Sequence, residues 1–138
     1  DRFELPRDLA YNKDGARVEC TIDNLPQDAQ FIDIGAQTIA DYQALLASAK
    51  TIFANGPAGI YEQDGFDVGT RGIWGGIADS DAYSVIGGGD TVSSATKFID
   101  LTKISYVCTA GGAMVRFMSG KKLPLIAAME QAYERQKL

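Results

Sequence analysis

Apolar residues follow two alternating patterns along most of the chain, short continuous runs and longer stretches with helical spacing. The short runs are typical of buried strands, and they lie at residues 31–34, 51–54, 83–86 and 104–108. The helical stretches follow them, at residues 38–49, 65–79, 92–98 and 114–118. A strand followed by a helix, repeated four times, is typical of a parallel sheet with helices on both faces. We therefore predict an α/β fold with a Rossmann-like parallel sheet sandwiched by helices.

The two ends of the chain depart from this repeat. Residues 3–11 and 17–22 have strand-like patterns separated by the turn-forming residues 12–15, so a β-hairpin is expected at the start. A last helix is expected to begin near Pro124. Its spacing predicts an inward-facing apolar side made of Leu125, Ile126, Met129, Ala132 and Tyr133.

Two of the predicted helices carry features that constrain their packing. Thr38 and Asp41 have the spacing of a capping box, in which each side chain bonds the other's backbone N–H. The helix at residues 65–79 contains glycines that weaken it by about 1 kcal/mol each relative to alanine. Packing must therefore hold this helix, or another group must approach its backbone. These glycines are Gly69, Gly72, Gly75 and Gly76.

The strongest candidate for a binding site is the turn that ends the third apolar run. Gly87, Gly88 and Gly89 are followed by Asp90 and Thr91, which predicts a tight turn and a helix capped by Asp90 or Thr91. Glycines let backbone N–H groups come close to a ligand, and a helix N-terminus favours a phosphate. A carboxylate beside that phosphate suits Mg²⁺. A structural turn with Asp90 as a simple cap is the alternative.

Four glycine-marked segments are expected to gather at one edge of the sheet. Ligands of such sheets bind beyond the carboxyl ends of the strands. One ligand site explains four such segments at this edge better than four structural turns do. The segments are residues 33–35, 55–59, 87–91 and 109–113.

Composition narrows the choice of partner and compartment. The 138 residues are enough for one domain with a proper core. A net charge of -5 argues against a nucleic-acid partner. No apolar stretch is long enough for a membrane span, and no signal peptide opens the sequence. Cys20 and Cys108 do not make a disulfide framework, so we expect a reduced, cytoplasmic protein.

Missing residues and motifs exclude several kinds of chemistry. The sequence has no histidine, which removes histidine-based triads, metal sites and general bases. It has no G-x-x-x-x-G-K-[ST] phosphate loop and no G-x-G-x-x-G dinucleotide fingerprint. It also lacks the G-x-S-x-G turn of serine hydrolases.

Several spaced motifs occur in the order found in a known family. The main ones are N-G-P-A-G-I-Y-E at 55–62, I-G-G-G-D-T at 86–91, T-A-G-G-A at 109–113 and G-K-K-L-P at 120–124. Supporting stretches lie at residues 5–9, 33–39 and 66–70. On these motifs the chain resembles the carboxyl-terminal, nucleotide-binding half of phosphoglycerate kinase, over about residues 3–129.

The resemblance implies a glycolytic enzyme that moves a phosphoryl group between 1,3-bisphosphoglycerate and ADP, giving 3-phosphoglycerate and ATP with Mg²⁺. It implies that Glu62 bonds the ribose hydroxyls and that Asn55 lies near the transferring phosphate. Pro57, Gly59 and Ile60 would line the base and sugar pocket. Glu62 as a surface carboxylate and Asn55 as a turn residue are the structural alternatives.

The phosphate contacts are implied in the same way. Gly87, Gly88, Gly89 and Thr91 would contact the nucleotide phosphates, and Asp90 would hold the metal. Gly111 and Gly112 would head a second helix facing the transferred phosphoryl group, unless they are only a helix start. Phosphoryl transfer depends on positioning and charge stabilisation, so the lack of histidine is compatible with this reaction.

The chain departs from the family pattern in two residues and in extent. Ala54 stands where many members have Trp, and Ala110 replaces the first glycine of T-G-G-G. The amino-terminal substrate domain and the G-G-A-K strand with its phosphate-binding Lys are missing. We therefore expect residues 1–138 to form part of the nucleotide domain, inactive alone. Its sheet would be incomplete at the amino-terminal side, with an exposed edge that favours self-association.

Two other functions remain open on the residues alone. A different phosphate binder, such as a nucleotide-sugar or acyl-phosphate protein, would keep the glycine edge without needing Glu62 or Asp90. A non-catalytic α/β interaction domain would use the glycines only as structural turns.

Overall fold

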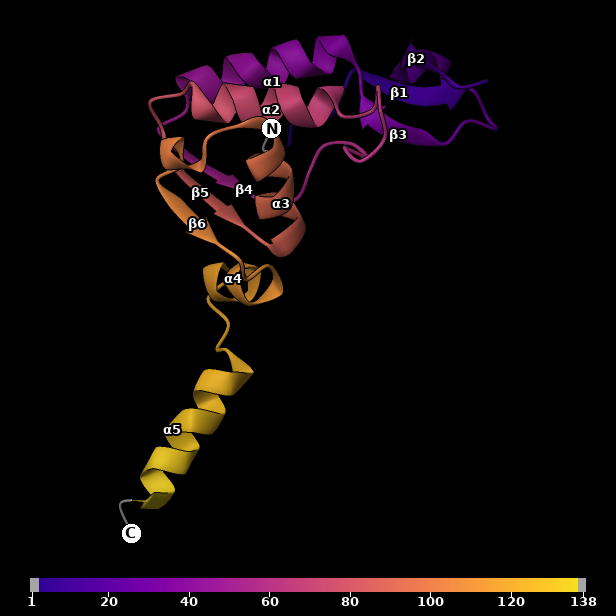
Figure 1. The fold of residues 1–138 in the computed structure, drawn as a ribbon. Coiled ribbons are helices and arrows are strands. Elements are labelled where there is room, and N and C mark those ends of the chain that lie inside the picture. Colours follow the sequence, from indigo (N-terminus) through magenta and orange to yellow (C-terminus); the bar gives the residue numbers. More distant parts are fainter. Residues whose placement is uncertain (1–2, 137–138) are drawn as a thin grey trace.

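Two three-stranded sheets organise residues 3–136, which are the residues that this computed structural model describes (Figure 1). The first sheet is antiparallel in the order β2-β1-β3, and the second is parallel in the order β4-β5-β6. The strands are β1 (Asp8–Lys13), β2 (Ala16–Thr21), β3 (Phe31–Ile34), β4 (Thr51–Ala54), β5 (Tyr83–Gly87) and β6 (Tyr106–Cys108).

The helices connect and flank these strands. Helices α1 and α2 pack side by side, and α3 follows β5 (Figure 1). The helices are α1 (Ala36–Ser48), α2 (Val68–Ala78), α3 (Gly89–Phe98), α4 (Gly112–Met118) and α5 (Pro124–Gln136), with 3₁₀ turns η1 (Ile22–Asn24) and η2 (Leu101–Lys103). The predicted α/β class, with a parallel sheet flanked by helices, is confirmed.

The predicted β-hairpin at the start is also confirmed. Strands β1 and β2 pair antiparallel, with Lys13 opposite Ala16. The turn between them needs left-handed backbone, with φ of 53° at Asp14 and 85° at Gly15. The Asn12 side chain accepts a hydrogen bond from the Gly15 N–H at 2.8 Å. Asn, Asp and Gly are the residues that tolerate such a turn.

Strand β3 lies in a different sheet from the one we predicted. It pairs antiparallel with β1, Leu9 lying opposite Ile34, so the parallel sheet has three strands among the described residues. The fully buried Asp33 carboxylate accepts a hydrogen bond from Arg17 of β2 at 2.7 Å. Residues 33–35 therefore do not end a strand of the parallel sheet. A four-residue apolar run does not reveal which strand it pairs with.

The predicted capping box at the start of α1 is wrong. The helix begins at Ala36, with Gly35 before it, so Thr38 lies in the first turn. Its cap comes from Asp8, whose carboxylate accepts hydrogen bonds from the N–H groups of Gln37 and Thr38 at 2.9 and 2.8 Å. A Cβ on Gly35 would lie 2.2 Å from the Asp8 carboxyl carbon, so the cap needs a glycine there.

Two of the glycines of α2, Gly72 and Gly76, lie where α1 packs against the backbone of the helix. A Cβ on Gly72 would lie 2.6 Å from Cγ2 of Ile39, and one on Gly76 would lie 3.1 Å from Cδ1 of Leu46. The expectation that another group approaches this helix is therefore confirmed.

The main core lies between the parallel sheet and its helices. Trp74 of α2 is buried there, and its indole N–H donates to Ser94 of α3 at 3.1 Å. The neighbouring buried apolar residues include Ile52, Ile77, Ile86 and Ala95. On the opposite face of the sheet, Phe53, Tyr83 and Tyr106 are exposed. The core therefore covers one face of the sheet and fixes the strand ends around which the candidate site is built.

Helix α5 begins at Pro124 as predicted, but its apolar residues do not point into a core. Figure 1 shows the helix extending away from the rest of the chain. Leu125, Ile126, Met129 and Tyr133 are all exposed. Helical spacing shows which side of a helix is apolar, but it does not show what lies against that side.

Candidate functional site

A cavity of about 590 Å³ lies beyond the carboxyl ends of β4, β5 and β6. Three of the four predicted glycine-marked segments border it, and each one follows a strand of the parallel sheet. The predicted residues that line it are Asn55, Pro57, Gly88, Gly89, Asp90, Thr91, Gly111 and Gly112. This position is the one expected for ligands of parallel sheets.

Helix α3 begins earlier than the sequence predicts. Gly88 precedes its first residue with φ of 104°, a conformation that favours glycine. Asp90 and Thr91 therefore lie in the first turn, and no side chain caps this helix end. The predicted cap by Asp90 or Thr91 is wrong because the Gly88 turn lets the helix start at Gly89. The N–H groups of this turn have no intrahelical acceptor, which leaves them available to a ligand.

Two hydrogen bonds hold the loop after β4, one to the end of β5 and one to the first turn of α3. The Asn55 side-chain amide donates to the Gly87 carbonyl at 2.7 Å. The Gly56 N–H donates to the Thr91 hydroxyl at 2.6 Å, and Thr91 is buried. Thr91 thus uses its side chain to position the loop, and its backbone lies in the first turn of α3.

Gly87 and Gly59 lie outside the cavity lining. Gly87 is a buried residue at the end of β5. Gly59 packs against Asp33, since a Cβ added there would lie 2.3 Å from its Oδ1. The Gly59 N–H donates to the Thr70 hydroxyl at 3.0 Å. Both glycines support the loops that border the cavity.

Ile60 and Glu62 lie further along the same loop, also outside the cavity lining. The Ile60 N–H donates to the Ile32 carbonyl at 2.9 Å, which ties the loop to β3. Partial burial raises the pKa of Tyr61, and the charge of Glu62 with a hydrogen bond to it, followed by the charge of Asp90, raises that pKa further. The charges of the Glu62 and Asp90 carboxylates therefore both act on the Tyr61 hydroxyl.

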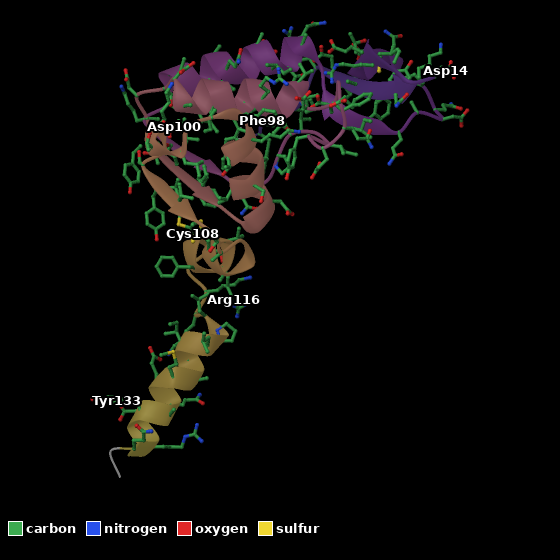
Figure 2. All side chains as sticks on the ribbon, in the orientation of Figure 1. Asp14, Phe98, Asp100, Cys108, Arg116 and Tyr133 are labelled. Atoms are coloured by element: carbon green, nitrogen blue, oxygen red, sulfur yellow. The ribbon has the colours of Figure 1, made fainter. Side chains whose placement is uncertain are left out.

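The structure adds cavity residues that our site prediction missed. Arg116, Ser119 and Lys121 line its α4 side. Arg116 lies one helical turn beyond Gly112, on the same side of α4. Its place on the cavity side of the helix could therefore have been predicted from the helical spacing. Figure 2 shows Arg116 on α4 beneath Cys108. Lys121 belongs to the G-K-K-L-P motif but follows the helix, where spacing alone does not predict its direction.

The donor set fits a magnesium ion that arrives with a nucleotide better than a resident metal. Among residues 3–136, no three Cys, Asp or Glu side chains are grouped closely enough to hold a metal ion. Asp90 is the carboxylate that lines the cavity. Mg²⁺ is often held by one or two carboxylates together with substrate phosphates, and Asp90 meets that requirement.

None of the helices in the described part of the chain is long and apolar enough to cross a membrane.

Comparisons with known proteins identify the family of the chain. The family model for phosphoglycerate kinase matches residues 1–121. The phosphoglycerate kinases of Methanothermus fervidus and Methanopyrus kandleri are 43% and 45% identical to it over 135 and 129 residues. These alignments cover 98% and 94% of this chain, but 33% and 32% of the two relatives. The chain thus spans about a third of the length of the curated relatives it matches.

Solved structures agree with the sequence matches. Phosphoglycerate kinase from Coxiella burnetii aligns with a TM-score of 0.82 at 40% identity, covering 90% of this chain and 33% of that one. The enzyme from Pyrococcus horikoshii OT3 aligns with a TM-score of 0.79 at 38% identity, covering 94% and 33%. The sequence motifs, the glycine-bordered cavity and these matches agree, and the chain belongs to the phosphoglycerate kinase family.

Proposed function

We propose that this chain forms the nucleotide-binding part of a phosphoglycerate kinase. That enzyme transfers a phosphoryl group between 1,3-bisphosphoglycerate and ADP, giving 3-phosphoglycerate and ATP. The observation that carries the proposal is the meeting of three glycine-marked segments and Asp90 around one cavity at the carboxyl edge of the parallel sheet. The family membership of the chain supports it independently.

The phosphates of the nucleotide would lie against the first turn of α3. Its N–H groups and the positive end of the helix dipole favour anions. Gly88 and Gly89 line the cavity without a side chain, so phosphates can come close to their backbone. A Cβ on Gly88 would also lie 3.3 Å from both the Asn55 amide nitrogen and the Thr91 hydroxyl, which would crowd the two bonds that hold the loop. Asp90 would hold Mg²⁺, which neutralises charge on the phosphate oxygens.

The sugar and base would lie along the loop after β4. Pro57 borders the cavity, and Gly59 and Ile60 are held by the hydrogen bonds to Thr70 and Ile32. Glu62 follows them in the same loop, and we assign it to the ribose hydroxyls. A carboxylate accepts two hydrogen bonds readily, which suits the paired hydroxyls of a ribose.

Gly111 and Gly112 border the cavity across from Gly88. A Cβ on Gly88 would lie 3.6 Å from the Gly111 Cα, so the two backbones approach closely. We assign this glycine pair to the side of the cavity where the phosphoryl group is transferred. The Ala110 carbonyl packs near Gly87, so the alanine that departs from the family pattern lies beside the cavity lining.

The residues of this chain act by holding and orienting the nucleotide. None of them needs to form a covalent bond with the phosphoryl group, because positioning and charge stabilisation account for most of the catalysis in such reactions. The chain spans about a third of its relatives. We therefore expect the residues that bind the phosphoglycerate to lie outside this sequence and the chain by itself to show no turnover.

Thermal unfolding with and without millimolar Mg-ADP tests the nucleotide site. A ligand at 100 times its dissociation constant stabilises the fold by about 2.7 kcal/mol, which raises the Tm of a domain of this size by several degrees. Asp90→Ala should remove most of the rise. Asp28→Ala is the matched control, because Asp28 is also exposed and lies outside the cavity lining.

A rise that Asp90→Ala leaves unchanged would contradict the assigned role of Asp90. No rise in the unaltered chain would contradict the proposal that this chain holds a nucleotide.

A further inference from the structure

The α4 side of the cavity carries positive charge at its far end. Arg116 lies in the last turn of α4, and Lys121 follows the helix by three residues. Both side chains line the cavity with the glycine segments. Phosphate oxygens are recognised by such cations, through charge and through donated hydrogen bonds.

A tight helix end brings Lys121 back beside Arg116. Gly120 has φ of 73°, and its N–H donates to the Phe117 carbonyl at 2.9 Å. The Lys121 N–H donates to the Arg116 carbonyl at 3.1 Å. These two bonds and the left-handed glycine form a Schellman motif, which reverses the chain direction. The position of Lys121 is therefore set by backbone hydrogen bonds and not by a loose loop.

Neither cation is neutralised by an acidic side chain of the described residues. The ion pairs found within residues 3–136 include neither Arg116 nor Lys121. The next residue, Lys122, does pair with Glu130 of α5. The Arg116 guanidinium donates from Nε to the Lys122 carbonyl at 2.9 Å, which orients the group and leaves its other N–H donors for another acceptor.

The cavity thus has opposite charges on its two sides. Asp90 lines the cavity in the first turn of α3, whereas Arg116 and Lys121 lie on the α4 side. A magnesium–nucleotide complex has the same arrangement, with the cation on some phosphate oxygens and negative charge on the others. The charges on the two sides therefore match those of a phosphate chain that lies across the cavity.

We propose that Lys121, with Arg116 beside it, binds the terminal phosphate of the nucleotide. This inference rests on the proposed function, since it extends the same site. With the ribose near Glu62 and the transferred phosphoryl group beside Gly111 and Gly112, as proposed above, the two cations would contact the outer oxygens of the last phosphate from the far end of α4. Lys121 and Arg116 then discriminate among nucleotides by their number of phosphates.

Calorimetric titration of AMP, Mg-ADP and Mg-ATP into the chain tests this assignment at constant ionic strength. Lys121→Gln should weaken Mg-ATP binding by about tenfold, the loss expected for one charge-assisted hydrogen bond. AMP binding should change by less than about twofold, because its single phosphate does not reach Lys121. Arg116→Gln should show the same ranking among the nucleotides.

Lys122→Gln is the matched control. It removes the same charge from the adjacent residue, which lies outside the cavity lining and pairs with Glu130. If the unaltered chain binds Mg-ATP but Lys121→Gln and Lys122→Gln bind it equally, the inference is wrong and the proposed function stands. Equal weakening of AMP and Mg-ATP by Lys121→Gln also overturns the inference. If the unaltered chain binds neither Mg-ADP nor Mg-ATP, both proposals fail.

Discussion

Thr91 links the two loops that border the cavity, and replacing it with Val tests how far that link prepares the site for a nucleotide. Valine keeps the shape of the buried side chain but cannot accept the hydrogen bond from the Gly56 N–H, which is 2.6 Å long. The loop that begins with Asn55 would then keep the Asn55–Gly87 hydrogen bond to the end of β5 but would lose its bond to α3.

The expected magnitude follows from this single hydrogen bond. A typical intramolecular hydrogen bond contributes about 1 kcal/mol to stability, and Gly56 is exposed, so water partly replaces the lost acceptor. We expect Thr91→Val to lower the free energy of unfolding by about 1 kcal/mol. Ordering the released loop on binding should weaken the affinity for Mg-ADP by about fivefold, which corresponds to the same energy.

Thr91→Ser separates the hydroxyl from the methyl group. Serine keeps the acceptor for Gly56 but removes one buried methyl group, which costs about 1 kcal/mol of stability. Both variants should therefore be destabilised by a similar amount in urea unfolding, while only Thr91→Val should lose affinity for Mg-ADP. The two measurements together distinguish a positioning role from a general loss of stability.

Amide hydrogen exchange at Gly56 tests the link without any ligand. In the nucleotide-free chain, Thr91→Val should speed exchange of the Gly56 amide about fivefold, the change expected from an opening that costs about 1 kcal/mol less. Thr91→Ser should leave that rate near the value of the unaltered chain. Unchanged Gly56 exchange in Thr91→Val would refute the reasoning, even if affinity fell, because the hydroxyl would then act on the ligand itself.

Two further predictions concern stability and association. Burial acts to raise the pKa of Asp8, but hydrogen bonds from Thr38 and Gln37 and the charge of Arg7 outweigh it, so the pKa lies below its ordinary value of 3.8. The stabilising effect of Asp8 is therefore complete above about pH 4 and is lost as the pH falls through the folded-state pKa. Asp8→Asn should remove this part of the acid dependence in urea unfolding and lower the free energy of unfolding by about 2 kcal/mol at pH 7. Asp41→Asn is the control, because Asp41 forms an exposed pair with Arg7, and it should lower the free energy of unfolding by less than about 1 kcal/mol. Equal losses in the two variants would contradict the assigned cap. The exposed apolar residues of α4, α5 and the open sheet face should make the chain self-associate in light scattering at micromolar concentration, and Phe117→Lys should weaken this; a monomer at all concentrations would contradict it.

The features that could be predicted from the sequence depend on neighbouring residues. Gly88 and Gly89 end a buried strand and start a helix, and glycine has a local conformational reason to lie at such a turn. The hairpin turn at Asp14 and Gly15 has the same kind of cause. Parallel strands then bring their carboxyl ends to one edge whatever their spacing in sequence. The cavity could therefore be predicted without knowing any long-range contact.

The incorrect predictions concern contacts between residues that are distant in sequence. Asp8 caps α1 by bonding residues 29 and 30 positions later in the sequence. Thr38 and Asp41 have capping-box spacing, so the sequence pattern predicted a local cap instead. Strand β3 joins the hairpin because β1 offers it an edge and Arg17 neutralises Asp33. Neither choice is visible in a run of four apolar residues, since any exposed strand edge could accept it.

The positively charged side of the cavity shows where local reasoning could have gone further. Gly120 after a predicted helix is a known signal for a left-handed helix end, and that geometry reverses the chain towards the helix it leaves. Applied to residues 112–121, it returns Lys121 to the level of Arg116, as the hydrogen bond between their backbones shows. Together with the predicted glycine edge, such a reversal would have indicated a cation on the α4 side of the cavity, which Asp90 also lines. The same reasoning could not have placed α5. The geometry at Gly120 determines the position of Lys121, but it does not determine which residues pack against a helix that begins at Pro124.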